Sequence, residues 1–458
     1  MHKKIIILLF VHLLFCATHA QQSKLRADSI YNQMKKVADW QWKTLETNGW
    51  KSPKKGWRSG TMYAGMMAWG KIANDETYYK KLIQVGEDNK WKIGPERLHA
   101  DDYCVGQLYS QLYTIYKNPK YIEDFKSIAD TIVMLPHTES LEWKNSIQLR
   151  EWAWCDALFM GPPALAYLYE ATGDDKYLNM ASKLWWKTTD YLYNKDEHLF
   201  FRDQSYFLKQ EKNGAKVFWS RGNGWVMGGL IRVLSLMPKN HPDREKFIQL
   251  FKEMSVKVAS IQQPDGSWHA SLLDPASFPV KETSGTGFYC YALTWGINQG
   301  ILPYKEYSSV VGKAWNVLTT SVHPNGKLGF VQAVGASPDK VSYDDTEVYG
   351  VGAFLLAGSE MLRMTINQEK NTVIAEAVNP DAINKQVKVI VDWKTLTSKI
   401  KRIQEKKLEV QDVITGQNIP FEIVYDNQHK PENIVFNTSM NPGSSRFFRV
   451  AKKISTKE

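Results

Sequence analysis

The stretch Ala73-Asn74-Asp75-Glu76-Thr77-Tyr78 decides the fold, because its turn residues stop one helix and its aromatic residue anchors the next. Two close copies follow: Lys117-Asn118-Pro119-Lys120-Tyr121 and Thr172-Gly173-Asp174-Asp175-Lys176-Tyr177. Looser copies occur at 241–247 and 302–304. The pattern recurs every 40 to 70 residues. This recurrence predicts helical hairpins stacked in series.

A second set of turns belongs to the opposite ends of these hairpins. Asn48-Gly49-Trp50, Pro264-Asp265-Gly266-Ser267-Trp268 and Pro324-Asn325-Gly326-Lys327-Leu328 are tight turns followed by a large apolar residue, and 197–201 is a glycine-free relative. From residue 28 to about 363, apolar residues recur at three- and four-residue spacing. Hairpins in series with long loops at one end predict a mainly α fold, an (α/α)6 barrel. An open solenoid is the alternative, because repeats do not show closure.

The pattern changes after Thr365. Short, partly alternating apolar runs at 373–378, 386–391, 408–413, 421–424 and 447–450 are separated by turn residues. We expect a small C-terminal β-sandwich with a structural role. The predicted organisation is therefore a signal peptide at 1–20, a barrel at 21–365 and a β-sandwich at 366–458.

The N-terminus has the features of a signal peptide. Lys3 and Lys4 precede an apolar run, and small residues stand before a cut at Gln21. We expect an exported, periplasmic protein with no membrane span after cleavage. The remaining Cys104, Cys155 and Cys290 are too few for a disulfide framework, so we expect small buried hydrophobes.

The composition points towards sugars and away from nucleic acids. The chain has seventeen tryptophans and twenty-two tyrosines, and such rings often lie against the apolar faces of sugars, although they could also fill a helical core. The net charge is +10. A mildly basic protein could suit a polyanionic substrate, but the basic residues do not cluster with aromatics, so we expect no nucleic-acid partner.

Asp156 is the most informative single acid. It lies in the apolar, aromatic run Trp152-Ala153-Trp154-Cys155-Asp156-Ala157-Leu158-Phe159-Met160. One interpretation is an N-cap for the helix that follows. The other is a general acid that holds its proton because its surroundings exclude water.

Three more polar groups precede expected helices. They are His99-Ala100-Asp101-Asp102-Tyr103-Cys104, Trp219-Ser220-Arg221-Gly222-Asn223-Gly224-Trp225 and Glu282-Thr283-Ser284-Gly285-Thr286-Gly287. The paired acids could cap a helix, the arginine could hold a carboxylate, and the two glycines could admit a ligand. All these groups recur at one end of the expected barrel among tryptophans. A glycoside-processing cleft explains that coincidence better than independent caps.

These motifs, together with Tyr349-Gly350-Val351-Gly352-Ala353-Phe354, resemble the unsaturated rhamnogalacturonyl hydrolases of glycoside hydrolase family 105, relatives of the unsaturated glucuronyl hydrolases. The resemblance covers about residues 28–363. It implies a glycoside hydrolase that acts on lyase-generated oligosaccharides ending in a 4,5-unsaturated uronic acid. The implied chemistry is hydration of the vinyl ether, without a metal or an organic cofactor.

By motif position, Asp156 matches the family's general acid/base, which protonates C4 and activates water for C5. Asp101 matches the second acid, with Asp102 as the expected cap, although their adjacency leaves a one-residue ambiguity. Arg221 and Trp225 would hold the uronate, through its carboxylate and by ring contact. Further substrate contacts are assigned in the same region to His99, Trp154, Arg202, Trp219, Asn223 and Thr286.

The chain departs from the family at Phe200-Phe201-Arg202-Asp203, where members often have a histidine after the aromatic pair. Arg202 could add positive charge for the uronate or pair with Asp203. The sugar next to the uronate is therefore left open, as is the oligomeric state.

Two rival functions remain at this point. One is an inverting hydrolase of saturated glycans, with Asp101 and Asp156 about 6.5–9.5 Å apart. The other is a non-catalytic carbohydrate-binding protein, which would not need a buried Asp156.

Overall fold

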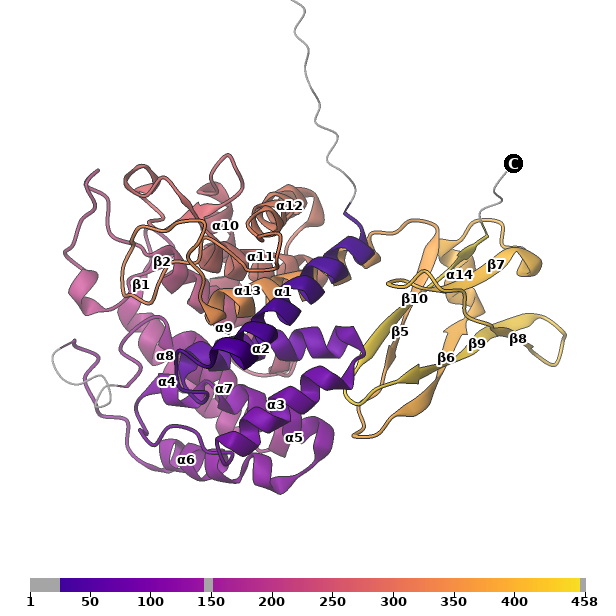
Figure 1. The fold of residues 1–458 in the computed structure, drawn as a ribbon, viewed down its shortest axis with the longest axis horizontal. Coiled ribbons are helices and arrows are strands. Elements are labelled where there is room, and N and C mark those ends of the chain that lie inside the picture. Colours follow the sequence, from indigo (N-terminus) through magenta and orange to yellow (C-terminus); the bar gives the residue numbers. More distant parts are fainter. Residues whose placement is uncertain (1–24, 144–150, 454–458) are drawn as a thin grey trace, which may run out of the picture.

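The computed structural model describes residues 25–143 and 151–453, and its main body is a ring of helices (Figure 1). The inner helices are α2 (Trp57–Ala73), α5 (Gly106–Tyr116), α7 (Ala157–Thr172), α9 (Ser220–Leu236), α11 (Thr283–Asn298) and α13 (Val348–Asn367). Each packs against the next, and α13 returns to pack against α2. This last contact closes the ring, so the expected α/α barrel is confirmed and the open solenoid is excluded.

An outer layer of helices covers the ring. It consists of α1 (Ala27–Asn48), α3 (Glu76–Asp88), α6 (Glu123–Met134), α8 (Asp175–Leu192), α10 (Arg244–Ser260) and α12 (Tyr304–Thr320). The repeated stretch at 73–78 joins α2 to α3, as predicted, and its Asp75 accepts a hydrogen bond from the Thr77 amide at 2.9 Å. The copies at 117–121 and 172–177 lie at the same end of the barrel. We call it the back end, because the inner helices finish there.

The inner helices begin at the opposite end, which we call the site end. The loops there contain a short helix, α4 (Ala100–Tyr103), and two pairs of two-residue strands. These strands are β1 (Tyr193–Asn194) with β2 (Leu199–Phe200), and β3 (Trp268–His269) with β4 (Lys281–Glu282). The polar motifs of the sequence therefore do meet at one end of the barrel.

Glycines allow some inner helices to touch backbone to backbone. A Cβ atom on Gly65 of α2 would lie 2.5 Å from the carbonyl oxygen of Gly352 on α13. A Cβ on Gly229 of α9 would lie 2.1 Å from the carbonyl oxygen of Leu158 on α7. Side chains cannot fit at these points, so the ring closes only with glycine there.

Residues 372–452 form a separate C-terminal unit beside the barrel (Figure 1). Its elements are β5 (Thr372–Val378), β6 (Lys385–Asp392), α14 (Trp393–Lys399), β7 (Leu408–Asp412), β8 (Glu422–Tyr425), β9 (Pro431–Met440) and β10 (Ser445–Lys452). The strands make two antiparallel sheets, in the orders β5-β10-β7 and β6-β9-β8. Sequence analysis missed two of these elements, namely β9 and α14.

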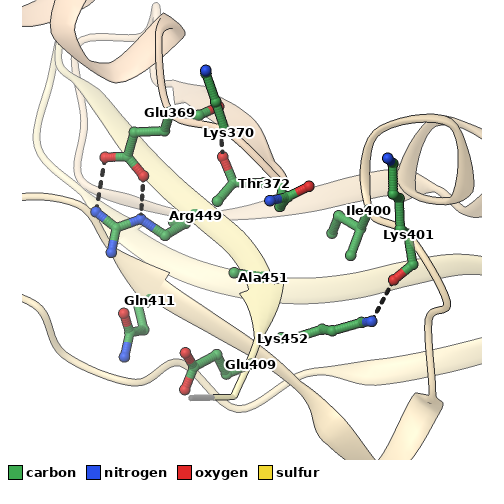
Figure 2. A pocket seen from close by; sticks show the side chains of 11 residues that line it. Glu369, Lys370, Thr372, Ile400, Lys401, Glu409, Gln411, Arg449, Ala451 and Lys452 are labelled. Carbon is green, nitrogen blue, oxygen red and sulfur yellow. Dashed lines mark hydrogen bonds and ion pairs between the residues drawn. The ribbon is translucent and has the colours of Figure 1, made fainter.

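Ion pairs and hydrogen bonds attach this unit to the barrel. Arg363 of α13 donates to both carboxylate oxygens of Glu376 on β5, at 2.8 and 3.0 Å. Arg449 of β10 makes a similar two-point contact with Glu369, which lines an open pocket of about 710 Å3 (Figure 2). The Tyr79 hydroxyl on α3 donates to the Gly443 carbonyl at 3.0 Å.

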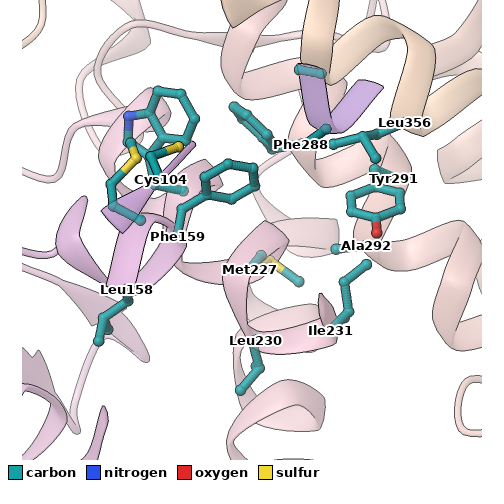
Figure 3. Close-up of a cluster of buried hydrophobic side chains, with 14 of the residues drawn as sticks. Cys104, Leu158, Phe159, Met227, Leu230, Ile231, Phe288, Tyr291, Ala292 and Leu356 are labelled. Carbon is teal, nitrogen blue, oxygen red and sulfur yellow. The ribbon is translucent and has the colours of Figure 1, made fainter. Parts of the chain in front are cut away.

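An apolar plug fills the middle of the barrel. Its centre is a layer of rings from three inner helices, with Phe159 5.3 Å from Phe288 and Trp225 4.5 Å from Phe288 (Figure 3). All three side chains are buried. The plug therefore separates the site end from the back end.

The structure tests the prediction about the cysteines but not the prediction of export. Cys104, Cys155 and Cys290 are buried and unbonded, as predicted. The proposed signal peptide at 1–20 lies outside the described residues, so export stays a prediction. Within the described ranges, every helix is too short or too polar to span a bilayer.

The helix contact at Gly229 yields a stability prediction. Gly229→Ala forces a methyl group against the Leu158 carbonyl, so we expect the free energy of unfolding to fall by about 3 kcal/mol. Urea denaturation measures this loss. The control is Gly335→Ala, since nothing lies closer than 3.8 Å to a Cβ there. Equal stability of the two variants would contradict the argument.

Candidate active site

Asp156 lies at the site end, directly before α7. Its side chain makes no capping hydrogen bond to the helix, so the capping interpretation is wrong. The preceding chain turns at Trp152, whose φ of 44° is unusual for a bulky residue and typical of strained functional sites. The Cys155 amide then donates to the Arg202 carbonyl at 2.8 Å. These contacts leave the Asp156 carboxylate 14% exposed beside the 199–203 segment.

The second acid comes from the neighbouring hairpin. His99 stands between two carboxylates, with Nε2 3.6 Å from Asp101 Oδ2 and Nδ1 3.1 Å from Asp102 Oδ1. Asp102 also accepts a hydrogen bond from the Glu96 amide at 3.0 Å. It does not cap α4 or α5, which corrects its expected role. Because Asp102 is occupied by backbone and histidine, the geometry favours Asp101 as the second acidic residue of the site.

Burial raises the pKa of both acids. Desolvation is the main cause for Asp101, and the nearby Asp156 and Asp102 carboxylates add to it, against the opposing effect of His99; its pKa reaches about 7. Desolvation also raises the pKa of Asp156, against the lowering effects of Arg202 and Arg221. Burial lowers the pKa of His99, but Asp102 and Asp101 more than offset this and leave it raised. The site can therefore hold a proton on a carboxyl near neutral pH.

Arg202 connects the acids to an aromatic wall. Its Nε lies 3.8 Å from Asp156 Oδ2, and its Nη1 donates to Asp203 Oδ2 at 2.5 Å. Its guanidinium also lies 4.7 Å from the centre of the Trp143 ring. The Nε hydrogen has no hydrogen-bond partner among the described residues. Arg202 thus does pair with Asp203, and still presents positive charge next to the candidate acid.

Arg221 is more enclosed than its expected role requires. Its Nη1 and Nη2 donate to the carbonyls of Gln332 and Ala333, both at 2.8 Å. The guanidinium lies between the rings of Trp219 and Tyr349, at 4.3 and 5.0 Å. Its predicted hold on a substrate carboxylate stays a prediction, because both terminal nitrogens already donate to the protein.

Several other expected contacts are part of the packing. Trp225 is 1% exposed and packs among other aromatic rings, and its predicted contact with sugar stays a prediction. Asn223 is buried and bonds both the amide and the carbonyl of Phe200, at 2.7 and 3.0 Å. Thr286 accepts from the Trp268 amide and donates to the Glu282 carbonyl. These side chains hold the loops of the site together.

The two glycines of the arginine motif also serve packing. A Cβ on Gly222 would lie 3.1 Å from Cys155 Sγ, and one on Gly224 would lie 3.2 Å from the Phe288 Cβ. Their missing side chains make room for Cys155 and Phe288, whereas we expected them to make room for a ligand. Likewise, Glu282 caps α11 by accepting hydrogen bonds from the amides of Ser284 and Gly285, at 2.9 and 2.7 Å.

Two tryptophans at the site end were not identified from the sequence. Trp143 covers Arg202 and lies 6.5 Å from the ring of Trp154, which in turn lies 6.0 Å from His99. Trp57, the first residue of α2, stacks on Tyr349 at 5.5 Å. Both are partly exposed. Their loops carried no polar motif, so nothing local in the sequence marked them.

Two carboxyls with raised pKa values, arginines beside them and partly exposed tryptophans meet at the site end of an α/α barrel, an arrangement typical of a carbohydrate-processing enzyme. The chain belongs to Glycosyl Hydrolase Family 88, whose model matches residues 26–365, and it is a glycoside hydrolase. The predicted resemblance to the unsaturated uronyl hydrolases is confirmed at this level.

Individual relatives agree with the family. The chain is 37% identical to an unsaturated 3S-rhamnoglycuronyl hydrolase of Alteromonas sp. (strain LOR), over 67% of this chain and 78% of that one. It is equally identical to a protein of the same name from Formosa agariphila, over 67% and 84% of the two chains. The solved structure of a family 88 glycosyl hydrolase from Bacteroides vulgatus aligns with a TM-score of 0.68 and 27% identity, over 74% of this chain and all of that one.

The raised pKa of Asp101 yields a prediction about stability and pH. The unfolded state loses this proton near pH 4 and the folded state near pH 7, so ionisation at higher pH opposes folding. Asp101→Asn should therefore stabilise the protein by up to about 4 kcal/mol above pH 7, and the gain should vanish below pH 4. Urea denaturation at pH 4 and pH 8 measures the difference.

Asp102→Asn is the matched control. Asp102 accepts a hydrogen bond from the Glu96 amide and holds His99, so its substitution should bring no gain at pH 8. A pH-independent effect of Asp101→Asn would contradict the assigned ionisation.

Proposed function

We propose that the protein removes a terminal 4,5-unsaturated uronic acid from oligosaccharides that a polysaccharide lyase has produced. The observation that supports this most directly is the pair Asp101 and Asp156, two desolvated carboxyls at one site with a cation against one of them. The reaction starts with a proton on carbon, which requires an acid that is still protonated near neutral pH.

The proposed reaction is hydration of the vinyl ether. The carboxyl of Asp156 gives its proton to C4, and positive charge develops at C5 and the ring oxygen. The Asp156 carboxylate then takes a proton from water, whose oxygen bonds to C5. The resulting hemiketal opens the ring, and the hemiacetal left at C1 releases the neighbouring sugar. Asp156 is protonated again at the end, so no cofactor enters the balance.

The surrounding residues support this division of roles. Asp101 lies close enough to Asp156 for the Asp156 charge to raise the pKa of Asp101, so the protonation of the two acids is coupled. His99 contacts Asp102 through Nδ1 and Asp101 through Nε2, so its ring orients Asp101. Trp143, which is partly exposed, provides a ring face for the sugar, and the buried Trp154 supports it from behind at 6.5 Å.

We further propose that the sugar beyond the uronate is a rhamnose that carries a 3-sulfate. Two relatives at 37% identity bear the name unsaturated 3S-rhamnoglycuronyl hydrolase. Arg202, where a histidine was expected, offers to an anionic group of the substrate a permanent charge whose Nε makes no hydrogen bond to the described residues. The released products would be a keto sugar acid and the shortened oligosaccharide.

We also propose that the two C-terminal sheets form a β-sandwich with an accessory role. They share one buried apolar cluster, in which the rings of Phe436 and Phe448 lie 5.0 Å apart.

Ultraviolet absorbance tests the reaction. Lyase-generated oligosaccharides from several uronic-acid polysaccharides, sulfated and unsulfated, are mixed with wild type and Asp156→Asn. We expect the absorbance of the double bond to fall with wild type alone, and fastest on the sulfated rhamnose-linked uronide.

Binding and saturated substrates separate the rival functions. Asp156→Asn should still bind the unsaturated oligosaccharide while losing at least about 10³-fold in kcat. Cleavage of a saturated oligosaccharide at a comparable rate would establish ordinary hydrolysis and overturn the proposal. Binding without turnover by wild type on every unsaturated substrate would support a carbohydrate-binding protein.

Arg202→Met tests the cation beside Asp156. Arg202 lowers the pKa of Asp156, so its removal raises that pKa and keeps the acid protonated to higher pH. We expect kcat/KM to fall by about 10²-fold through lost substrate contact, while the alkaline limb of the kcat profile moves to higher pH. A shift to lower pH would contradict the proposed arrangement. The control is Lys209→Met, which removes a cation that lies over the Tyr206 ring.

A further inference from the structure

A second cavity lies at the back end of the barrel, beneath the C-terminal unit. It holds about 400 Å3, which is the scale of a small-molecule site. Side chains from the inner helices form its floor and walls, and β5, β10 and the turn before β10 contribute the rest. The lining residues used below are Tyr167, Glu170, Arg232, Tyr291, Ser359 and Glu360. The buried Phe159 ring of the apolar plug lies 5.8 Å from the Arg232 guanidinium, so the plug bounds the cavity on its inner side.

Arg232 of α9 is the residue that indicates a bound ligand. It is 3% exposed and lines the cavity. Its Nε donates to Gln107 Oε1 at 2.8 Å, and Gln107 is itself fixed by a hydrogen bond from its amide to the Phe159 carbonyl. The guanidinium lies 4.8 Å from the Tyr167 ring. It is therefore held rigidly from the barrel side, in the wall of the cavity.

No carboxylate of the described residues lies within ion-pair distance of the Arg232 guanidinium, although its charge acts on Glu170 and Tyr291 is a side-chain hydrogen-bond partner. Nη2 is enclosed and makes no hydrogen bond to the described residues. A buried charge without a partner is costly, and a guanidinium is best satisfied by a planar, two-oxygen anion. Such a side chain in the wall of a cavity is typical of an anion-binding site.

The rest of the lining suits a ligand with hydroxyl groups and disfavours a second negative charge on that ligand. Glu170 and Glu360 also face the cavity, and burial raises the pKa of each. The inner helices end here, and the negative ends of their dipoles oppose further anions. Both features favour ligand groups that donate hydrogen bonds, such as the hydroxyls of sugars, which carboxylates commonly bind. The phenol groups of Tyr167 and Tyr291 lie beside the Arg232 guanidinium and complete a mixed polar and aromatic lining.

We propose that this cavity binds a small monoacid that carries several hydroxyl groups, of the sugar-acid class, with its carboxylate on Arg232 and its hydroxyls towards Glu360 and Glu170. The site is separate from the catalytic end, and it does not depend on which glycan the enzyme cleaves.

Calorimetric titration with glucuronate tests the proposal, with glucose and sulfate as comparison ligands. Glucuronate should bind with roughly millimolar affinity, glucose and sulfate at least tenfold more weakly. Arg232→Met removes the guanidinium. Ser359→Trp fills the cavity from α13 while leaving Arg232 in place. Arg202→Met alters only the catalytic end.

We expect Arg232→Met and Ser359→Trp to weaken glucuronate binding at least tenfold, and Arg202→Met to leave it unchanged. Circular dichroism establishes that each variant is folded, and if Arg232→Met is not, Ser359→Trp decides. Loss of binding in Arg202→Met alone would place glucuronate at the catalytic end and overturn the proposal. Equal affinity for sulfate or for glucose would overturn the assigned class of ligand.

Discussion

Direct contact between the backbones of inner helices is the constraint on which this structure depends. Gly65 against Gly352, and Gly229 against Leu158, bring neighbouring helices closer than any side chain would permit. The ring consequently closes tightly enough for aromatic side chains to fill its middle, and the starts of the inner helices converge. Asp101, Asp156 and Arg221 come from three different hairpins, so the chemistry at the site end exists only because the helices meet so closely.

Within that frame, the two acids are distinguished by their neighbours. Both are desolvated by the same barrel end, but Asp101 faces His99, whereas Asp156 faces two arginines. Arg202 cannot move freely, because Asp203 and Trp143 hold it from two sides. The protein therefore fixes a cation against Asp156, the proposed general acid, before substrate arrives. An anionic substrate would share that cation, which couples binding of charge to the proton affinity of Asp156.

Local patterns in the sequence revealed the barrel, because helix stops and starts are encoded within a few residues, as at 73–78. They also drew attention to Asp156, a carboxylate among tryptophans, and to the paired acids Asp101 and Asp102 before an expected helix. The roles of Arg221 and Asn223 could not be read in this way. Arg221 is satisfied by Gln332, 111 residues further along the chain, and Asn223 by the backbone of Phe200. Strand β9 was missed because its apolar run covers only residues 434–436 and one of its buried positions is the polar Thr438, and α14 because it is only 7 residues long.

The closure of α13 onto α2 also determines when the molecule can be completed. Most of α2 is buried, yet its partner α13 follows only after the other four inner helices, and Asn74 after α2 bonds Asn441 of the C-terminal unit. Until α13 has been made, the apolar sides of α2 have no permanent cover. Contacts between distant parts of a chain form slowly and leave intermediates prone to aggregation. The growing polypeptide consequently needs protection until α13 has emerged, a demand that an open solenoid would not impose.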